Sequence, residues 1–176
     1  MRYFLAIPLL EETKQKLHKI NSELSEFKDL KFVNPDNMHL TLLFLGENNA
    51  EEKIKELKKI KFKPFKIKTE KISTFPEEGK IRLVWVTLKE SKELMELQRK
   101  ISKLFNIKKE FKPHITLARI KRIDKKHRAE LENKIKNMKL NNITINVNNF
   151  KLYSSELTVL GPVHRVVEYF EADKKK

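Results

Sequence analysis

The sequence contains an internal repeat, which limits the chain to few architectures. After a first short apolar segment, the hydrophobic spacing predicts helix, strand, helix, strand, strand, and then the same order again. This unit is far longer than a solenoid repeat, so it indicates two similar lobes. We expect one α+β domain over residues 1–176, with repeat halves at about 11–88 and 91–170. A pseudo-twofold axis between the two α+β lobes would set their matching strands face to face across a groove.

The same periodicity places the individual elements. Strands are expected at 2–7, 38–45, 65–75, 81–88, 112–120, 143–153 and 157–170. Helices are expected at 11–27, 51–60, 91–105 and 124–138. The N-terminal apolar segment is short and runs directly into Glu11 and Glu12, which favours a strand over a signal peptide. With no apolar run near the roughly 20 residues that span a bilayer, we expect a cytoplasmic protein.

The charge of the chain favours a polyanionic partner. Lys and Arg number 39 against 24 Asp and Glu, a formal net charge of +15. Such a field attracts nucleic acid, although a lysine-rich composition also occurs on merely solvated surfaces. The chain has no cysteine, which excludes disulfides, thiolate nucleophiles and cysteine-ligated zinc. With only three glycines, it also lacks a glycine-rich loop for a nucleotide, and we expect no cofactor.

Two His-x-Thr motifs stand on matching strands of the repeat. They are His39/Thr41 and His114/Thr116, whose histidines lie 75 residues apart. Because side chains alternate along a strand, each histidine shares a face with its threonine while the intervening residue enters the core. A pseudo-twofold axis would set the two motifs across one groove.

Two imidazoles on opposite sides of a phosphate can act together as general base and general acid. The threonine hydroxyls can donate hydrogen bonds to phosphate oxygens, so this chemistry needs no metal. A cyclic phosphate is a suitable target, because opening it needs one activated water and one protonated leaving oxygen. A single His-x-Thr is usually structural, and the two pairs could also satisfy each other inside an interface. Zinc is disfavoured without a nearby carboxylate, and His18 and His127 are expected to be solvated.

Further candidates surround these motifs. Arg119 ends the second motif strand, but strict alternation puts it opposite His114 unless the strand bends or bulges. Arg82 opens the strand at 81–88, and for both arginines a solvated surface position is the alternative. The aromatic residues Phe4, Trp85 and Tyr153 are candidates for base stacking, although aromatic residues on strands more often lie in the core.

These motifs resemble the 2H phosphoesterase superfamily, and within it the bacterial and archaeal RNA 2′,3′-cyclic phosphodiesterases, formerly called 2′-5′ RNA ligases. Similar segments run almost from end to end: RYFLAI at 2–7, HLTLLFLG at 39–46, FKPHITLARI at 111–120, LYSSEL at 152–157 and GPVHRVVEYF at 161–170. Relatives commonly carry tyrosine at the position of His164, so this residue is a departure that adds a titratable group.

The resemblance implies a bilobal, pseudo-twofold α+β fold in which two antiparallel sheets face a central groove and the helices lie outside. It also implies hydrolysis of 2′,3′-cyclic phosphate ends of RNA, with tRNA fragments among the expected partners. It implies that His39 protonates the departing 3′ oxygen and His114 activates water, a division of roles that the residues alone leave open. By the same resemblance, Thr41, Thr116 and Arg119 hold the phosphate. Arg82, His164 and Phe4 are candidates for other substrate contacts, Arg82 less so because Ile81 replaces a proline of the relatives.

Three alternatives remain at this point. The same groups would serve the reverse reaction, a 2′-5′ joining of tRNA halves. A non-catalytic RNA-binding module would keep the charge and bind in a salt-sensitive manner. A third alternative is a small substrate such as ADP-ribose 1″,2″-cyclic phosphate. We expect a monomer in each case, because both motifs belong to one chain.

Overall fold

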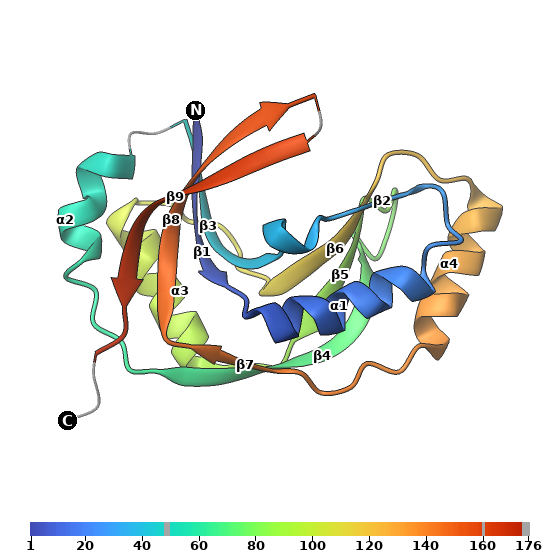
Figure 1. Ribbon diagram of the computed structural model, residues 1–176, viewed down its shortest axis with the longest axis horizontal. Helices are drawn as coiled ribbons and strands as arrows, with labels where there is room; N and C mark the ends of the chain where they lie inside the picture. The colour runs from blue at the N-terminus through green and yellow to red at the C-terminus, as the bar shows by residue number, and fades with distance from the viewer. Residues whose placement is uncertain (48–49, 160, 174–176) are drawn as a thin grey trace.

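The computed structural model describes residues 1–47, 50–159 and 161–173 (Figure 1). Its elements, in chain order, are β1 (Arg2–Pro8), α1 (Glu11–Glu23), β2 (Leu30–Phe32), the 3-10 turn η1 (Pro35–Asn37), β3 (His39–Gly46), the 3-10 turn η2 (Ala50–Lys53), α2 (Ile54–Leu57), β4 (Phe65–Phe75), β5 (Leu83–Leu88), α3 (Lys92–Leu104), β6 (His114–Ile120), α4 (Lys125–Asn137), β7 (Thr144–Val147), β8 (Asn149–Thr158) and β9 (Gly161–Glu171). The first predicted strand and both motif strands are therefore present.

The strands form one antiparallel, strongly curled arrangement in the order β7-β4-β5-β6-β3-β1-β8-β9, with β2 paired to β6. Its two halves meet where β3 and β6 share the register pair Leu40 with Ile115. We call β3, β1, β8 and β9 the first lobe, and β6, β5, β4, β7 and β2 the second lobe. The predicted bilobal α+β fold is confirmed, and its two motif strands lie side by side where the lobes join.

Each lobe takes strands from both parts of the chain. In the first lobe, β3 pairs with β1, and β1 pairs in turn with β8 from the C-terminal part. In the second lobe, β6 pairs with β5, and β5 pairs with β4 from the N-terminal part. Neither sheet is complete without the other part of the chain. We therefore propose that the chain is one domain, and the predicted repeat boundaries stay a prediction.

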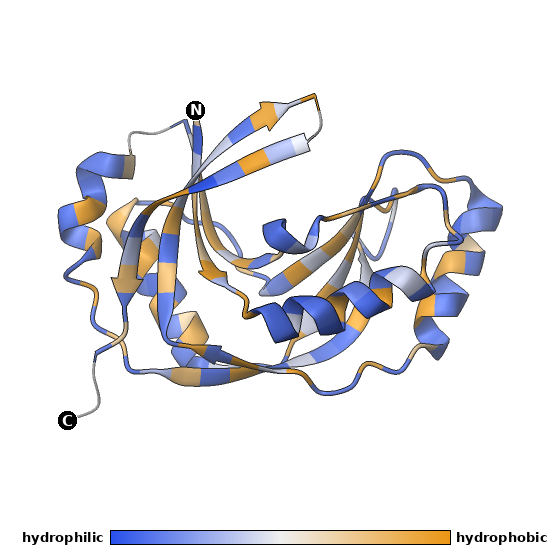
Figure 2. Ribbon diagram, in the orientation of Figure 1, coloured by the Kyte–Doolittle hydropathy of each residue, from blue (hydrophilic) through white to orange (hydrophobic). Residues whose placement is uncertain are grey.

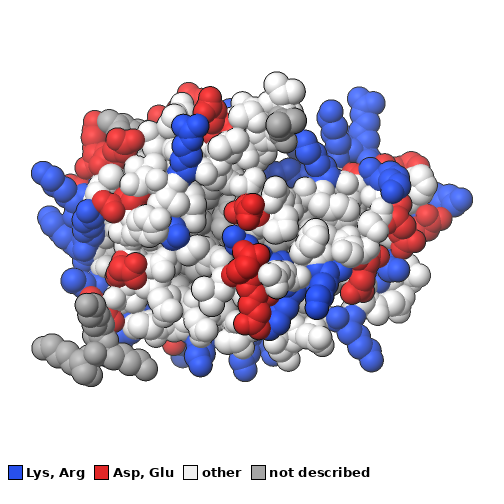
Figure 3. Space-filling view, in the orientation of Figure 1, with Lys and Arg blue, Asp and Glu red and all other residues white. Residues whose placement is uncertain are grey.

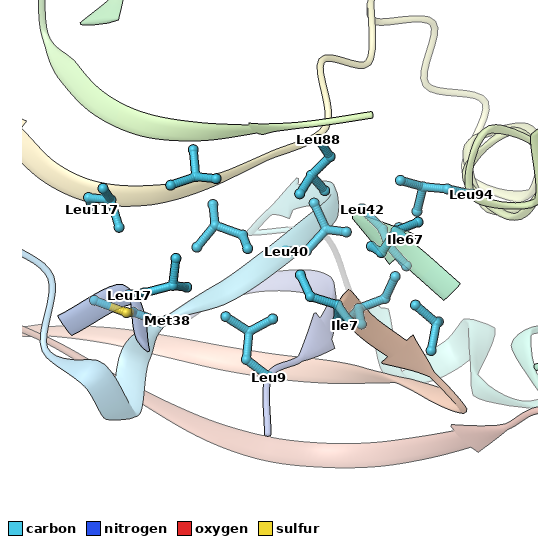
Figure 4. Packing of buried hydrophobic residues seen from close by; sticks show 14 of the residues in the cluster. Ile7, Leu9, Leu17, Met38, Leu40, Leu42, Ile67, Leu88, Leu94 and Leu117 are labelled. Atoms are coloured by element: carbon cyan, nitrogen blue, oxygen red, sulfur yellow. The ribbon is translucent and has the colours of Figure 1, made fainter. Parts of the chain in front are cut away.

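The apolar core lies behind the motif strands. Leu40 and Ile115 are both fully buried, and Leu42 and Leu117 extend the same face. Figure 4 shows Leu40 and Leu42 beside Leu117 and the α3 residue Leu94. Burying one such leucine contributes about 2 kcal/mol. The core thus fixes which face of β3 and β6 is turned away from the apolar interior.

The helix before each motif strand packs against the other motif strand, since α1 precedes β3 but contacts β6 and α3 precedes β6 but contacts β3. Helix α1 packs against β6, α3 against β3, and α4 against β4. The side of α1 toward the viewer in Figure 2 is largely hydrophilic, while Leu17 and Ile20 are buried. Each of the three helices has 13 residues. Among the described residues, no helix is long and apolar enough to cross a membrane.

Several predicted boundaries differ from the structure. The helix predicted to reach residue 27 ends at Glu23, because the chain then turns to form β2, a three-residue strand that the periodicity did not predict. In place of the helix predicted at 51–60, the structure has the 3-10 turn η2 followed by the single turn of α2. Leu57 is the buried residue of α2.

The predicted strand at 143–153 is split in two, because β7 pairs with β4 and β8 pairs with β1. The last hairpin also differs from its prediction, since Leu157 belongs to β8 and β9 begins at Gly161. Residue 160 of the predicted strand lies outside the described residues.

Candidate active site

The two motifs lie on adjoining strands and point to the same side. His39, Thr41, His114 and Thr116 are half-buried, whereas Leu40 and Ile115 between them are fully buried. Since Leu40 and Ile115 are direct register partners, the four motif side chains stand together on the opposite face of the strand junction. The predicted alternation is therefore confirmed at both motifs.

Each catalytic candidate is oriented by the same backbone contact. His39 Nδ1 lies 2.7 Å from the carbonyl oxygen of Asn37, and His114 Nδ1 lies 2.6 Å from that of Lys112. A carbonyl oxygen can only accept, so Nδ1 carries the proton and donates it in both contacts. No hydrogen bond from a described residue reaches Nε2 of either ring, which leaves this nitrogen to take up or deliver a proton.

In the part of the chain that the structure describes, the polar groups beside the histidines have no side-chain partner. Within residues 1–47, 50–159 and 161–173, the hydroxyls of Thr41 and Thr116 make no side-chain hydrogen bond, and the Arg119 guanidinium makes no ion pair. These two hydroxyls and one cation are free to contact an anion. In the same described ranges, no group of three or more His, Asp or Glu side chains is placed to hold a metal ion.

A bulge brings Arg119 to the histidine face. On β6, Thr116 pairs with Trp85 and Ala118 pairs with Val84, so Leu117 is an extra residue. Leu117 and Ala118 are both buried, and the exposed Arg119 comes directly after them. The bulge that Arg119 needs in order to reach the site is therefore present. The charge of Arg119 contributes to the lowered pKa of His39, of His114 and of a third histidine, His164, as expected for a guanidinium on the same face.

The first motif strand has a bulge in the same place, and it exposes a residue that the sequence reasoning missed. Thr41 pairs with Ala6 and Leu43 with Leu5, so Leu42 is the extra residue. Phe44 follows Leu43 on the strand and is the register partner of Phe4. This residue is 62% exposed. Phe44 and Arg119 both stand five positions after their histidines, a shared offset that was visible in the sequence.

The aromatic ring of Phe4 packs against the imidazole ring of His39. Its ring stacks on His39 with centroids 4.8 Å apart and on Tyr153 with centroids 5.1 Å apart, and only 3% of Phe4 is exposed. The predicted contact of Phe4 with a base is corrected accordingly, because protein rings already cover it. Trp85 supports His114 in the same way, with centroids 4.5 Å apart and 6% exposure.

The β8–β9 hairpin reaches the first motif through two residues. The ring of His164 meets His39 edge-on, with centroids 5.6 Å apart, and its Nδ1 is buried without a hydrogen-bond partner among the described residues. The side-chain amide of Asn37 donates to the carbonyl oxygen of Pro162 at 3.1 Å. Asn37 therefore contacts both His39, through its carbonyl, and the hairpin, through its amide. The sequence carried no signal for this link.

Burial governs the protonation of the site. Burial is the main reason that the pKa of His39 is lowered to about 4. The hydrogen bond to Asn37 opposes this shift, and the charges of His164, His114 and Arg119 add to it. Burial, and then the charge of Arg119, likewise lower the pKa of His114 and of His164. Both motif histidines are consequently neutral near pH 7 when no anion is bound.

The remaining candidates lie apart from this centre. Arg82 is exposed, and its backbone pairs with Phe75 and Ile120 at the edge of β5; its charge is not among those that lower the histidine pKa values. His18 and His127 are exposed, as predicted, and His127 lies 2.9 Å from Asp124. On the face shown in Figure 3, the basic side chains of the described residues lie among acidic ones and form no single basic patch.

Known proteins resemble this chain in sequence and in fold. The family model described as LigT like Phosphoesterase matches the chain twice, at residues 7–85 and 86–164. The chain therefore belongs to the LigT-like phosphoesterases, a family of 2H phosphoesterases.

Individual relatives match over nearly their whole length. An RNA 2′,3′-cyclic phosphodiesterase of Archaeoglobus fulgidus is 37% identical over 97% of this chain and 100% of its own. One of Methanocaldococcus jannaschii is 35% identical over 96% and 99%. Among solved structures, a Thermus thermophilus protein matches with a TM-score of 0.76, 30% identity and 97% coverage of each chain. LigT of E. coli in apo form has the same fold, with a TM-score of 0.76, 22% identity and 98% coverage of each chain.

Proposed function

We propose that this protein hydrolyses 2′,3′-cyclic phosphate ends of RNA to 2′-phosphate ends, without a metal. The observation that carries the proposal is the pair of matched histidines, each with Nδ1 held by a backbone carbonyl and Nε2 free. The free hydroxyls of Thr41 and Thr116 and the unpaired Arg119 suit the oxygens of a phosphate. The names of the relatives support the substrate class.

The reaction needs one proton removed from the attacking water and one proton delivered to the leaving O3′ oxygen. In our assignment, Nε2 of neutral His114 takes a proton from water as the water oxygen bonds to phosphorus. The bond from phosphorus to O3′ breaks, and Nε2 of protonated His39 gives its proton to O3′. Water is consumed, and exchange with solvent then restores both rings. The product keeps the phosphate on O2′.

The low pKa of His39 is compatible with its role as the acid. A bound phosphate places a negative charge beside the ring, and a nearby opposite charge raises the pKa of a histidine. Binding of the anion thus favours uptake of the proton that His39 later donates. His114 needs no such change, because a lowered pKa keeps it neutral and ready to act as the base.

The test uses a short RNA ending in a 2′,3′-cyclic phosphate, incubated with the protein in EDTA. We expect conversion to a 2′-phosphate end by the wild type and a loss of at least about 100-fold in kcat for His39→Ala and for His114→Ala. The matched control is His18→Ala, which removes an exposed helix histidine and should retain full activity.

The outcomes separate the candidate functions. If the wild type binds RNA in a salt-sensitive manner but does not convert the cyclic end, the result would favour a non-catalytic RNA-binding module over the enzyme. Activity that disappears in EDTA but returns with a divalent cation would contradict the metal-free assignment. A normal rate in either motif variant would remove that histidine from the mechanism.

A further inference from the structure

Two cations stand directly opposite each other next to the site. In the pairing of β2 with β6, Lys31 is the register partner of Arg119. Both side chains are exposed, whereas the flanking pairs contain the buried Leu30, Ile120 and Ala118. Directly opposite residues of an antiparallel pair project to the same face with Cβ atoms about 5 Å apart. Lys31 therefore lies beside Arg119 on the histidine face of the second lobe.

This placement is unfavourable for the protein alone. Like charges directly opposite each other destabilise a strand pair. The register row that contains them continues from Arg119 to Leu83 and then to Phe75, neither of which can neutralise a cation. Among the described residues, Lys31 and Arg119 have no ion pair, although many other lysines of this chain do. Two adjacent, unneutralised cations are the arrangement expected where an anion binds.

The position of Lys31 indicates which anion this is. On β6, Arg119 stands five residues after His114 and pairs with Lys31 of β2, so it lies between the second motif and β2. Lys31 is one strand spacing further out, about 4.8 Å beyond the β6 backbone. A group held between Lys31 and Arg119 is therefore displaced from the reacting phosphate toward the second lobe. In an RNA strand, the next anionic group is the adjoining phosphodiester.

We propose that Lys31 adds a second phosphate subsite beside the first, with Arg119 bridging the two. Lys31 then binds the phosphodiester that joins the terminal nucleotide to the preceding one, and Arg119 contacts both this phosphodiester and the reacting phosphate. The proposal rests on the proposed function, since it places a longer RNA in the same site. A planar guanidinium and an ammonium suit the two free oxygens of one phosphodiester. The subsite would let the enzyme prefer RNA ends over isolated cyclic nucleotides.

The experiment compares two substrates. One is a nucleoside 2′,3′-cyclic phosphate with a 5′ hydroxyl, and the other is a dinucleotide with the same cyclic end and one internal phosphodiester. For Lys31→Gln, we expect KM for the dinucleotide to rise about fivefold, with unchanged kcat, as for one charged contact. KM for the cyclic mononucleotide should stay unchanged. Lys31→Arg should restore the wild-type KM for the dinucleotide.

The matched control is Lys66→Gln. Lys66 is also an exposed strand lysine, but it pairs with Asn146 at the β4–β7 end of the sheet. Both substitutions remove one charge, so a general weakening of the field would affect them equally. Equal KM changes in the two variants, equal changes for the two substrates in Lys31→Gln, or no change at all would each overturn the subsite. If the wild type turned over neither of the two substrates, the result would instead overturn the proposed function.

A second readout does not depend on activity. Because Lys31→Gln removes like-charge repulsion, its melting temperature without RNA should rise by about 1 °C. With a non-reactive dinucleotide carrying a 3′-phosphate, the wild type should gain more stability than the variant. A fall in the melting temperature of the free variant would show that Lys31 has a structural role, which would contradict the subsite.

Discussion

At the residue scale, the two motifs are alike in orientation but differ in the residue that each strand exposes beyond its threonine. Both histidines have the same tautomer, and each donates from Nδ1 to the backbone carbonyl two positions earlier in the chain. Each also packs against an aromatic ring. After the matching bulges, however, the first strand exposes Phe44 and the second exposes Arg119. One side of the site thus offers an apolar ring and the other a cation. A nucleotide end has the same polarity, with a base on one side and phosphate on the other.

This asymmetry leads to a prediction for Phe44. If the terminal base lies on the exposed ring, Phe44→Ala should raise KM for a nucleoside 2′,3′-cyclic phosphate roughly fivefold or more, the loss of one stacking contact. The control is Leu157→Ala, which removes another exposed apolar side chain, at 81% exposure in β8. An abasic ribose 2′,3′-cyclic phosphate should show the same KM with wild type and Phe44→Ala. Unchanged KM for the nucleotide would exclude Phe44 from base binding.

At the element scale, the β8–β9 hairpin and the turn η1 are joined by Asn37. Its side chain holds Pro162 of the hairpin while its carbonyl orients His39. At the second motif, Lys112 supplies the corresponding carbonyl, and the structure shows its side chain near Phe75 and Glu110 instead. The orientation of His39 is thus coupled to the hairpin that carries His164.

We therefore predict that Asn37→Ala lowers kcat more than it changes KM. The backbone carbonyl remains, but it is no longer fixed by the hairpin. The free energy of unfolding should fall by about 1 kcal/mol, the net worth of one hydrogen bond. Asp36→Ala, an exposed neighbour in the same turn, is the control for general effects on η1. A loss of stability without any change in kcat would show that the link is structural only.

The sequence predicted elements better than it predicted connections between them. Alternation placed His39, Thr41, His114 and Thr116 correctly because each strand is anchored by apolar residues of strict parity. It left Arg119 undecided, since a bulge depends on the partner strand and only the pairing with β5 reveals it. Strand β2 was missed because three residues carry too little periodicity, and with it the position of Lys31. Phe4 was misassigned because its cover comes from β3 and β8, both distant in the chain.

At the scale of the whole molecule, the site should make stability depend on pH. The pKa of His39 falls from 6.5 in an unfolded chain to about 4 in the fold, so the unfolded state binds more protons between these values. Stability is then lost as the pH falls from 6.5 through 4. The full difference amounts to about 3 kcal/mol for this residue.

Urea unfolding at pH 7 and pH 4 should reveal this contribution. We predict that His39→Gln loses about 3 kcal/mol less stability than the wild type on acidification, because glutamine does not titrate. His18→Gln, an exposed histidine, should lose as much as the wild type. An equal loss in His39→Gln and wild type would mean that the ring of His39 is not protected from protonation in the fold.

The exchange of strands between the two parts of the chain has a consequence for how such a protein can arise. If the chain is divided between β4 and β5, each part pairs its motif strand with its own first strand, β3 with β1 and β6 with β5. The outer edge of that pair is then left open within the part. Two identical halves could close these edges by donating a strand to each other, and they would enclose one catalytic centre on their symmetry axis. Identical subunits, however, must carry the same residue at both motif positions. Covalent fusion releases that constraint, so one chain can carry Phe44 after its first motif and Arg119 after its second.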